Sequence, residues 1–239
     1  MPMSKSSDGI ALSDQNKIQS RRKFLRYAGG AALLAGGLAG CSKIHDIIDH
    51  HHGNGGNDKP IDLGTGDYGI LNYAYALEQL EAAYYTKLID DSFNALGESE
   101  FLLLKDIRDH EIAHREFFKK ALGSKAIRDL EPDFSSVNFG SRDSILATAK
   151  AFEDLGVSAY NGAGKLIVNP DYLTIAGKIV SVEARHAAFI RDLITPGSFA
   201  DNTVIDMNGL DKSNAPADVL AIANTYLKTK VSGNNLPTS

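Results

Sequence analysis

The stretch at residues 108–118, "RDHEIAHREFF", places two ionisable side chains on the apolar side of a predicted helix. An apolar stripe at helical spacing runs through Leu104 and Ile107, reaches Glu111 and His114, and resumes at the phenylalanine that ends the stretch. Burying charged groups without partners costs free energy, so something in the fold must compensate for them. This stretch therefore predicts a buried polar site inside a helical fold.

The surrounding sequence has the same helical period and lacks strand-like alternation. It predicts four long helices and a shorter fifth one, at about 68–90, 98–122, 142–166, 170–194 and 216–229. Asn169 before Pro170 fits a helix start, and Thr195-Pro196-Gly197 fits a helix end. Short connections after the first and third helices make each pair antiparallel. The middle connection, of about 20 residues, is long enough to cross a bundle from end to end.

The two halves of the predicted bundle resemble each other. The segment "ALEQLEAAYY" (76–85) aligns with "AFEDLGVSAY" (151–160), and "HEIAHREFF" (110–118) aligns with "VEARHAAFI" (182–190). An internal duplication of this kind predicts a bundle with pseudo-twofold symmetry. The matched pairs are Glu78 with Glu153, Tyr85 with Tyr160, Glu111 with Glu183, and His114 with His186.

Each of the four long helices carries an acid that interrupts its apolar stripe at about the same height. Four crowded carboxylates would repel one another, and two divalent cations would balance them. The Glu-x-x-His spacing puts both side chains on one helix face, so each such pair can hold a metal ion. Two such helices, with one Glu from each of two others, are the ligand set of di-iron and di-manganese bundles, and the donors suit Fe or Mn. We predict two iron ions, with manganese left open, held by Glu78, Glu111, His114, Glu153, Glu183 and His186.

Glu81 is a seventh candidate for the metal site. It faces inward one turn from Glu78, but its counterpart in the second half is Gly156. Two interpretations stay open for Glu81: an additional ligand, or an acceptor of hydrogen bonds behind the ligands.

Three further side chains lie near the predicted site. Tyr85 and Tyr160 follow the acids of their helices by two turns, and they are candidates for ligand hydrogen bonding or electron transfer, and so for a catalytic role. As core residues they would need no further explanation. We assign His110, at the edge of its stripe, to the surface.

Residues 1–41 have the features of an export signal rather than of a domain. "SRRKFLR" (20–26), with Arg21 and Arg22, resembles a twin-arginine signal, and the apolar stretch that follows, of about 14 residues, is too short for a membrane span of about 20. "LAGC" (38–41) resembles a lipobox, in which the thiol of Cys41 is lipidated. The leader predicts export by the twin-arginine machinery, to the periplasm or cell envelope, and anchoring to a membrane through Cys41.

The rest of the chain divides into a linker and one domain. Residues 42–66 are rich in Gly, Asn and Asp and predict a flexible linker, in which we interpret His50–His52 as solvated. Residues 67–232 form the predicted helical domain. The whole chain carries a net charge of −5, although its first 40 residues hold six basic and two acidic side chains. The acidic body argues against nucleic acid as a partner, and the single cysteine excludes an internal disulfide and a cysteine-rich zinc site.

With these residues assigned, residues 67–230 resemble bacterial ferritin-like domain proteins of the kind that includes desiccation-related proteins. The resemblance rests on "LEQLEAAYY", "IRDHEIAHREFF", "FEDLGVSAYNGAG" and "VEARHAAFIRDL". It implies an all-α, ferritin-like four-helix bundle with a long crossover, a short C-terminal helix and a carboxylate-bridged di-metal centre.

The resemblance is a poor guide to the reaction, because ferritin-like sites serve storage, oxidase and peroxidase chemistry. We expect a di-iron protein that reacts with dioxygen or peroxide, as an oxidase, ferroxidase or peroxide-consuming enzyme. The alternatives are a stress- or desiccation-related envelope protein with a structural metal, and a manganese-catalase-like enzyme. The sequence leaves open whether the protein forms a homo-oligomer.

Overall fold

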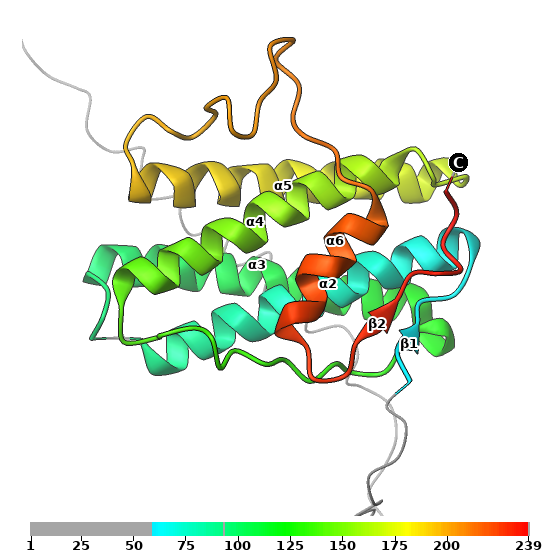
Figure 1. The fold of residues 1–239 in the computed structure, drawn as a ribbon, viewed down its shortest axis with the longest axis horizontal. Helices are drawn as coiled ribbons and strands as arrows, with labels where there is room; N and C mark the ends of the chain where they lie inside the picture. Colours follow the sequence, from blue (N-terminus) through cyan, green and yellow to red (C-terminus); the bar gives the residue numbers. More distant parts are fainter. Residues whose placement is uncertain (1–58, 93, 239) are drawn as a thin grey trace, which may run out of the picture. The chain divides into compact units, whose positions relative to one another are not determined.

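The computed structural model describes residues 59–92 and 94–238, and its main body is a bundle of four long helices. These are α2 (Gly66–Asp91), α3 (Glu98–Leu122), α4 (Arg142–Gly164) and α5 (Pro170–Ile194). α2 packs mainly against α3, and α4 packs mainly against α5 (Figure 1). The prediction of an all-α, ferritin-like bundle is confirmed. The predicted export signal at Arg21 and Arg22, the lipidation site at Cys41 and His50–His52 lie outside the described residues.

The helix ends follow from local capping. The side chain of Asn169 accepts a hydrogen bond from the backbone N–H of Asp171 at 2.9 Å, and Pro170 is the first residue of α5. Ser141 caps α4 through the backbone N–H of Ser144. α5 ends at Ile194, directly before the predicted Thr-Pro-Gly stop. Among the described residues, no helix is both long and apolar enough to cross a bilayer.

The connection from α3 to α4 runs from one end of the bundle to the other (Figure 1). It begins with a short 3₁₀ turn, η1 (Gly123–Lys125), and two polar side chains of α2 hold it in place. The amide of Asn72 donates to the carbonyls of Leu63 and Lys125 and accepts from the backbone N–H of Ile127. Gln79 accepts from the backbone N–H of Leu130 at 2.8 Å. The long crossover is therefore fixed to α2.

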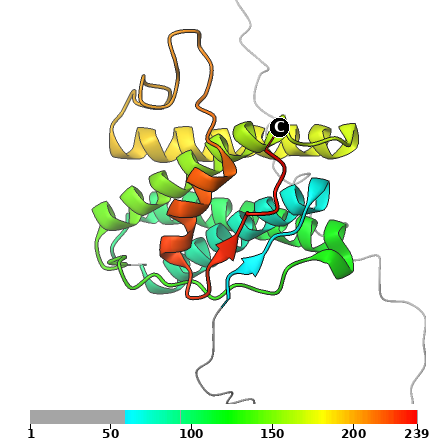
Figure 2. The ribbon, with the colours of Figure 1, turned by 45° about the vertical axis from the view of Figure 1, so that its right-hand side comes forward.

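The C-terminal segment differs from the predicted single helix at 216–229. α6 (Pro216–Ala223) and a 3₁₀ turn, η2 (Asn224–Tyr226), pack across α2 and α4, and the chain then forms the strand β2 (Val231–Ser232). β2 pairs in parallel with β1 (Ile61–Asp62), as Figure 2 shows.

β1 lies within the residues that the sequence assigns to the linker, and it pairs with β2 near the C-terminus. Leu63 has 0% exposure, and its backbone N–H donates to the carbonyl of Ser232 at 3.1 Å. A pair of two-residue strands is too short to leave a period in the sequence, so the sequence does not indicate it.

Candidate metal centre

One glutamate from each long helix points into the centre of the bundle. Glu78 comes from α2, Glu111 from α3, Glu153 from α4 and Glu183 from α5, and all four have 0% exposure. A buried acid on every helix at one height is what the interrupted stripes predict. Burying four ionised carboxylates without partners would be very costly, so these acids must either be protonated or be balanced by positive charge.

The two histidines of the Glu-x-x-His pairs complete two groups of four residues. In each group the donor atoms all lie within 4.8 Å of one another. The first group is Glu78, Glu111, His114 and Glu183; the second is Glu111, Glu153, Glu183 and His186. Glu111 and Glu183 belong to both groups, so the two candidate metal positions share two carboxylates.

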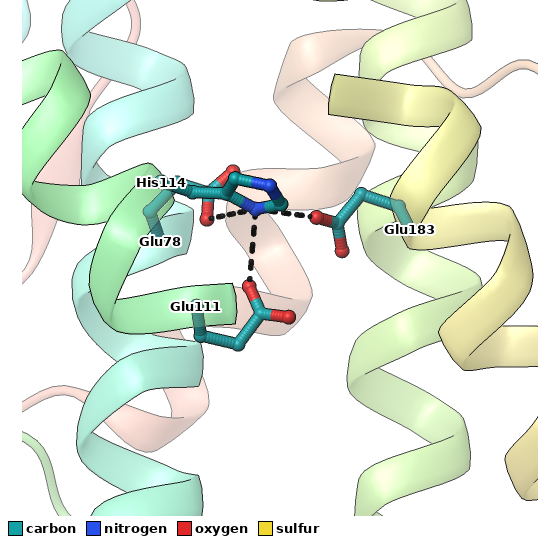
Figure 3. A group of neighbouring side chains, drawn as sticks. All are labelled: Glu78, Glu111, His114 and Glu183. Atoms are coloured by element: carbon teal, nitrogen blue, oxygen red, sulfur yellow. Dashed lines mark ion pairs between the residues drawn. The ribbon is translucent and has the colours of Figure 1, made fainter. Parts of the chain in front are cut away.

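The first imidazole lies among three carboxylates (Figure 3). His114 Nδ1 is 2.9 Å from Glu183 Oε1, 3.4 Å from Glu78 Oε2 and 3.6 Å from Glu111 Oε2. His114 itself lies on α3, one turn after Glu111, and its side chain is 13% exposed. This corner is therefore the least enclosed part of the group.

The second imidazole repeats the arrangement with the other oxygens. His186 Nδ1 is 2.8 Å from Glu111 Oε1, 3.4 Å from Glu153 Oε2 and 3.8 Å from Glu183 Oε2. Glu111 and Glu183 thus each direct one oxygen to each imidazole, which is the orientation of carboxylates that bridge two metal ions. Glu153 directs only Oε2 toward the centre, just as the acid of α2 does.

The facing atoms of both groups lack hydrogen-bond partners within the described part of the chain, although they lie close together. Buried polar atoms are nearly always satisfied, so a cluster of unsatisfied donors and acceptors indicates a missing ligand. Carboxylate oxygens and imidazole nitrogens are suitable donors for Fe or Mn, and the residues present therefore fit a di-metal centre. The unsatisfied atoms are Glu78 Oε2, both oxygens of Glu111 and of Glu183, Glu153 Oε2, and Nδ1 of His114 and of His186.

Without metal, the pKa values of the central acids shift in different directions. Burial raises the pKa of Glu78 and of Glu153 to about 8. Burial alone would also raise the pKa of Glu111, but the neighbouring imidazoles His114 and His186 outweigh it and lower that pKa to about 2. Glu111 therefore differs from Glu78 and Glu153, because the histidines act as its counter-ions.

Both imidazoles become strong bases for the same reason. Burial alone would lower the pKa of His114 and of His186, yet the facing carboxylates, Glu111 first, raise each pKa to about 12. With these pKa values, both imidazoles of the metal-free centre carry a positive charge that faces the carboxylates. A metal ion must displace these protons before it can bind to Nδ1.

The two tyrosines donate across the bundle to the acid of the other half. The hydroxyl of Tyr85 donates to Glu153 Oε1 at 2.5 Å, and the hydroxyl of Tyr160 donates to Glu78 Oε1. Each tyrosine thereby occupies the outer oxygen and leaves Oε2 to face an imidazole. Burial raises the pKa of both hydroxyls well above the usual range, so they stay protonated donors.

Glu81 lies beside the two groups and belongs to neither. Its side chain is buried, and a methyl group added at Gly156 would come within 3.0 Å of Glu81 Oε1 and 3.8 Å of Glu183 Oε2. The glycine opposite Glu81 therefore makes room for this additional acid. Burial and the charge of Glu183 raise the pKa of Glu81 well above its usual range, which favours its protonated form.

His110, which the sequence assigned to the surface, supports the second imidazole. Its Nδ1 lies 2.9 Å from His186 Nε2, and the two rings are stacked with an interplanar angle of 8°. A hydrogen bond on the outer nitrogen fixes the orientation of a ligand imidazole. The position matching His110 in the second half is Val182, so this support exists on one side only. The pairing joins α3 to α5, and helical periodicity alone does not predict it.

The comparison with known families agrees with this geometry. The model of the ferritin-like domain matches residues 66–196, which is more than half of the chain and covers all four long helices. No curated protein matches the sequence. A four-helix bundle with one buried acid per helix, a Glu-x-x-His pair on two of them and a match of this length leads to one assignment: the chain belongs to the ferritin-like domain family.

Proposed function

We propose that this protein is an exported, lipid-anchored di-iron carboxylate protein that reacts with dioxygen or peroxide. The observation that carries the proposal is the orientation of Glu111 and Glu183, which each direct one oxygen to each of the two candidate metal positions. A purely structural metal site needs only one metal ion whose ligands all come from the protein. Two adjacent positions joined by bridging acids suit chemistry that uses two electrons.

The residues divide into bridging and terminal ligands. Glu111 and Glu183 would bridge, Glu78 with His114 would complete one position, and Glu153 with His186 would complete the other. When bound, two ferrous ions supply two electrons, which with two protons reduce one dioxygen to hydrogen peroxide or one hydrogen peroxide to two waters. Manganese would fit the same donors.

The surrounding side chains would control protons and access. Tyr85 and Tyr160 hold the outer oxygens of the terminal acids and so limit how far these carboxylates can swing. Glu81, protonated and next to Glu183, is placed to hold a proton near the bridging acids. His114 is partly exposed, so polar species can approach from its side.

The proposed location rests on the leader. The twin-arginine-like segment with Arg21 and Arg22 supports export, and the lipobox-like segment ending at Cys41 supports acylation. Such a protein would handle iron or oxidants at the cell surface. A Cys41→Ser variant should yield protein without an acyl chain by mass spectrometry, and acylation that persists in this variant would refute the anchor.

Rapid-mixing kinetics test the proposed reaction. Protein loaded anaerobically with two ferrous ions should form ferric iron after mixing with dioxygen or with hydrogen peroxide, much faster than free iron does. Glu111→Ala should abolish the acceleration, because it removes a ligand to both positions. The matched control is Glu116→Ala, an exposed acid on the same helix, which should behave as wild type. A wild-type rate equal to that of free iron would refute the proposed reaction.

A structural metal is the second candidate, favoured by the complete burial of the four acids. In that case metal removal would lower the melting temperature, yet the loaded protein would accelerate neither oxidation. Oxygen release from peroxide by manganese-loaded protein would instead indicate a manganese-catalase-like reaction.

A further inference from the structure

An apolar cavity lies between the di-metal centre and one end of the bundle. It has a volume of about 70 Å³ and is lined by side chains of all four long helices. Its walls include Ala74 and Phe118, which lie one helical turn from Glu78 and from His114. Tyr160, whose hydroxyl donates to Glu78, forms the wall toward the centre. One tyrosine side chain therefore touches both the cavity and a candidate ligand.

The cavity exists because the duplicated halves differ at two positions on one helix. Ala159 and Ala163 of α4 stand where α2 has Tyr84 and Leu88. In the other half, Tyr84 fills the equivalent space, and its hydroxyl donates to the carbonyl of Ile145 at 2.6 Å. Aromatic rings pack around it at centroid distances of 5.0 to 5.9 Å, from Tyr85, Phe134, Phe139 and Phe152. The space is therefore open at one end of the bundle and filled at the other.

The lining chemistry selects against polar occupants. The walls are aliphatic and aromatic apart from the tyrosine hydroxyls, and the hydroxyl of Tyr160 is already engaged by Glu78. The buried hydroxyl of Tyr73 has no hydrogen-bond partner among the described residues, so it could offer a polar occupant one partner at most. A water molecule in a cavity needs two to four polar partners, and apolar cavities without them stay dry. Hydrogen peroxide, a donor at both ends, would face the same cost.

The size and position of the cavity suit a small gas. An apolar cavity of about 150 Å³ binds benzene or xenon, so this cavity of about 70 Å³ has room for a diatomic molecule or one xenon atom but not for a ring. Phe117, which is 40% exposed, stands at its outer edge on α3. The half-buried Tyr172 and Ala176 line the facing side on α5. An apolar path thus leads from the surface between α3 and α5 toward the centre.

We propose that this cavity is a binding site for dioxygen on its way to the metal centre, separate from the polar side at His114. The proposal rests on the proposed function and deepens it, because it assigns dioxygen to an apolar route and peroxide to a polar one. Dioxygen would enter through the apolar cavity beyond Tyr160. Peroxide and metal ions would enter where the imidazole of His114 is partly exposed.

Xenon binding tests the cavity without any metal. Crystals of the full-length protein under xenon pressure should show one xenon atom between Ala74, Phe118 and Ala163, whether or not metal is present. Ala163→Leu copies Leu88 of the other half and should remove this atom without lowering the melting temperature, because the added carbons fill empty space. Ala159→Val is a second filling variant, in case the first one folds poorly. Absence of xenon from wild-type crystals, or ordered water in its place, would overturn the site.

Kinetics test whether the cavity serves the metal centre. In ferrous-loaded protein, Ala163→Leu should slow oxidation by dioxygen at least several-fold and leave oxidation by hydrogen peroxide unchanged. The matched control is Ala151→Leu, the same substitution at an exposed position of α4, which should change neither rate. Equal dioxygen rates in wild type and Ala163→Leu would overturn the access role. A wild type that binds xenon but reacts with neither oxidant would refute the proposed function and the access role together, while the gas site would stand.

Discussion

Glu111 and Glu183 differ from the other two central acids in the use of their second oxygen. Both direct one oxygen to each imidazole, whereas Glu78 and Glu153 each give one oxygen to a tyrosine and one to the centre. Loss of one of these chemically similar acids therefore has a different effect from loss of another. Loss of a shared acid would disturb both candidate metal positions, and loss of a terminal acid would disturb one.

The contact of His110 with His186 makes the two candidate metal positions unequal as well. His110→Ala removes the partner of His186 Nε2, so we expect the affinity for one of the two metal ions to fall by about tenfold, within the range of about 10–100-fold for such supporting residues. The affinity of the position at His114 should be unchanged. A manganese titration followed by calorimetry resolves the two binding steps. Two unchanged steps in the variant would show that the stacked pair has no part in metal binding.

At the scale of elements, α2 both contributes to the candidate site and holds other segments of the domain in place, which no sequence motif indicates. Besides contributing Glu78 and Glu81, it holds the crossover through Asn72 and Gln79. The same Asn72 reaches the carbonyl of Leu63, next to β1. One buried amide therefore joins the crossover to the start of the folded domain.

Asn72→Ala tests this role. The variant loses three hydrogen bonds and leaves buried backbone groups without partners, so we expect the free energy of unfolding to fall by about 2–4 kcal/mol. This corresponds to a melting temperature lower by about 5–10 °C. The control Asn161→Ala loses one exposed hydrogen bond to the carbonyl of Lys212 and should change stability by less than about 0.5 kcal/mol. Similar losses in both variants would contradict the anchoring role of Asn72.

The helices were predictable because burial imposes a period on their sequences. The starts and ends of the helices at 98–122 and 170–194 agree with the prediction, since Asn169 and Pro170 act through the nearest residues alone. The pairing of β1 with β2 was not predictable, because it joins segments that are 170 residues apart and only two residues long. Contacts between distant elements leave no pattern in the local sequence, and such contacts determine where this domain begins and ends.

The same distinction holds within the candidate site. The six proposed ligands follow from helical spacing and from the duplication, and the structure brings them together in two groups. The crossed donation by Tyr85 and Tyr160 depends on how α2 and α4 pack, and the contact of His110 with His186 depends on α3 and α5. The sequence of one helix does not determine how the neighbouring helix is aligned along it.

At the scale of the whole molecule, metal binding and protonation compete for one cluster of donors. In the metal-free protein, the pKa of His114 and of His186 is raised from 6.5 to about 12, and that of Glu78 and of Glu153 from 4.5 to about 8. Groups with raised pKa values stabilise the folded state fully below their unfolded pKa values. Their contribution is lost as the pH rises toward the folded values.

We therefore expect the melting temperature of metal-free protein to fall between pH 5 and pH 8, where the glutamate contribution is lost and part of the histidine contribution with it. Because the pKa of Glu111 is lowered, its contribution to stability increases with pH, but only below its usual pKa of 4.5. Manganese should stabilise the protein more at pH 8 than at pH 5, because ligand protons compete with it. Differential scanning calorimetry with chelator and with manganese measures both slopes. A metal-free melting temperature that rises steadily over this range would contradict the described protonation.

The central claim is that one chain holds two metal ions on shared carboxylates, and elemental analysis of metal per chain tests it most directly. Protein purified from its native envelope should contain two ions per chain, of iron or manganese. Glu111→Ala should retain almost none, Glu78→Ala should retain about one, and the control Glu116→Ala should retain two. A wild-type protein without metal, or a Glu111→Ala variant that keeps two ions at wild-type affinity, would contradict the account.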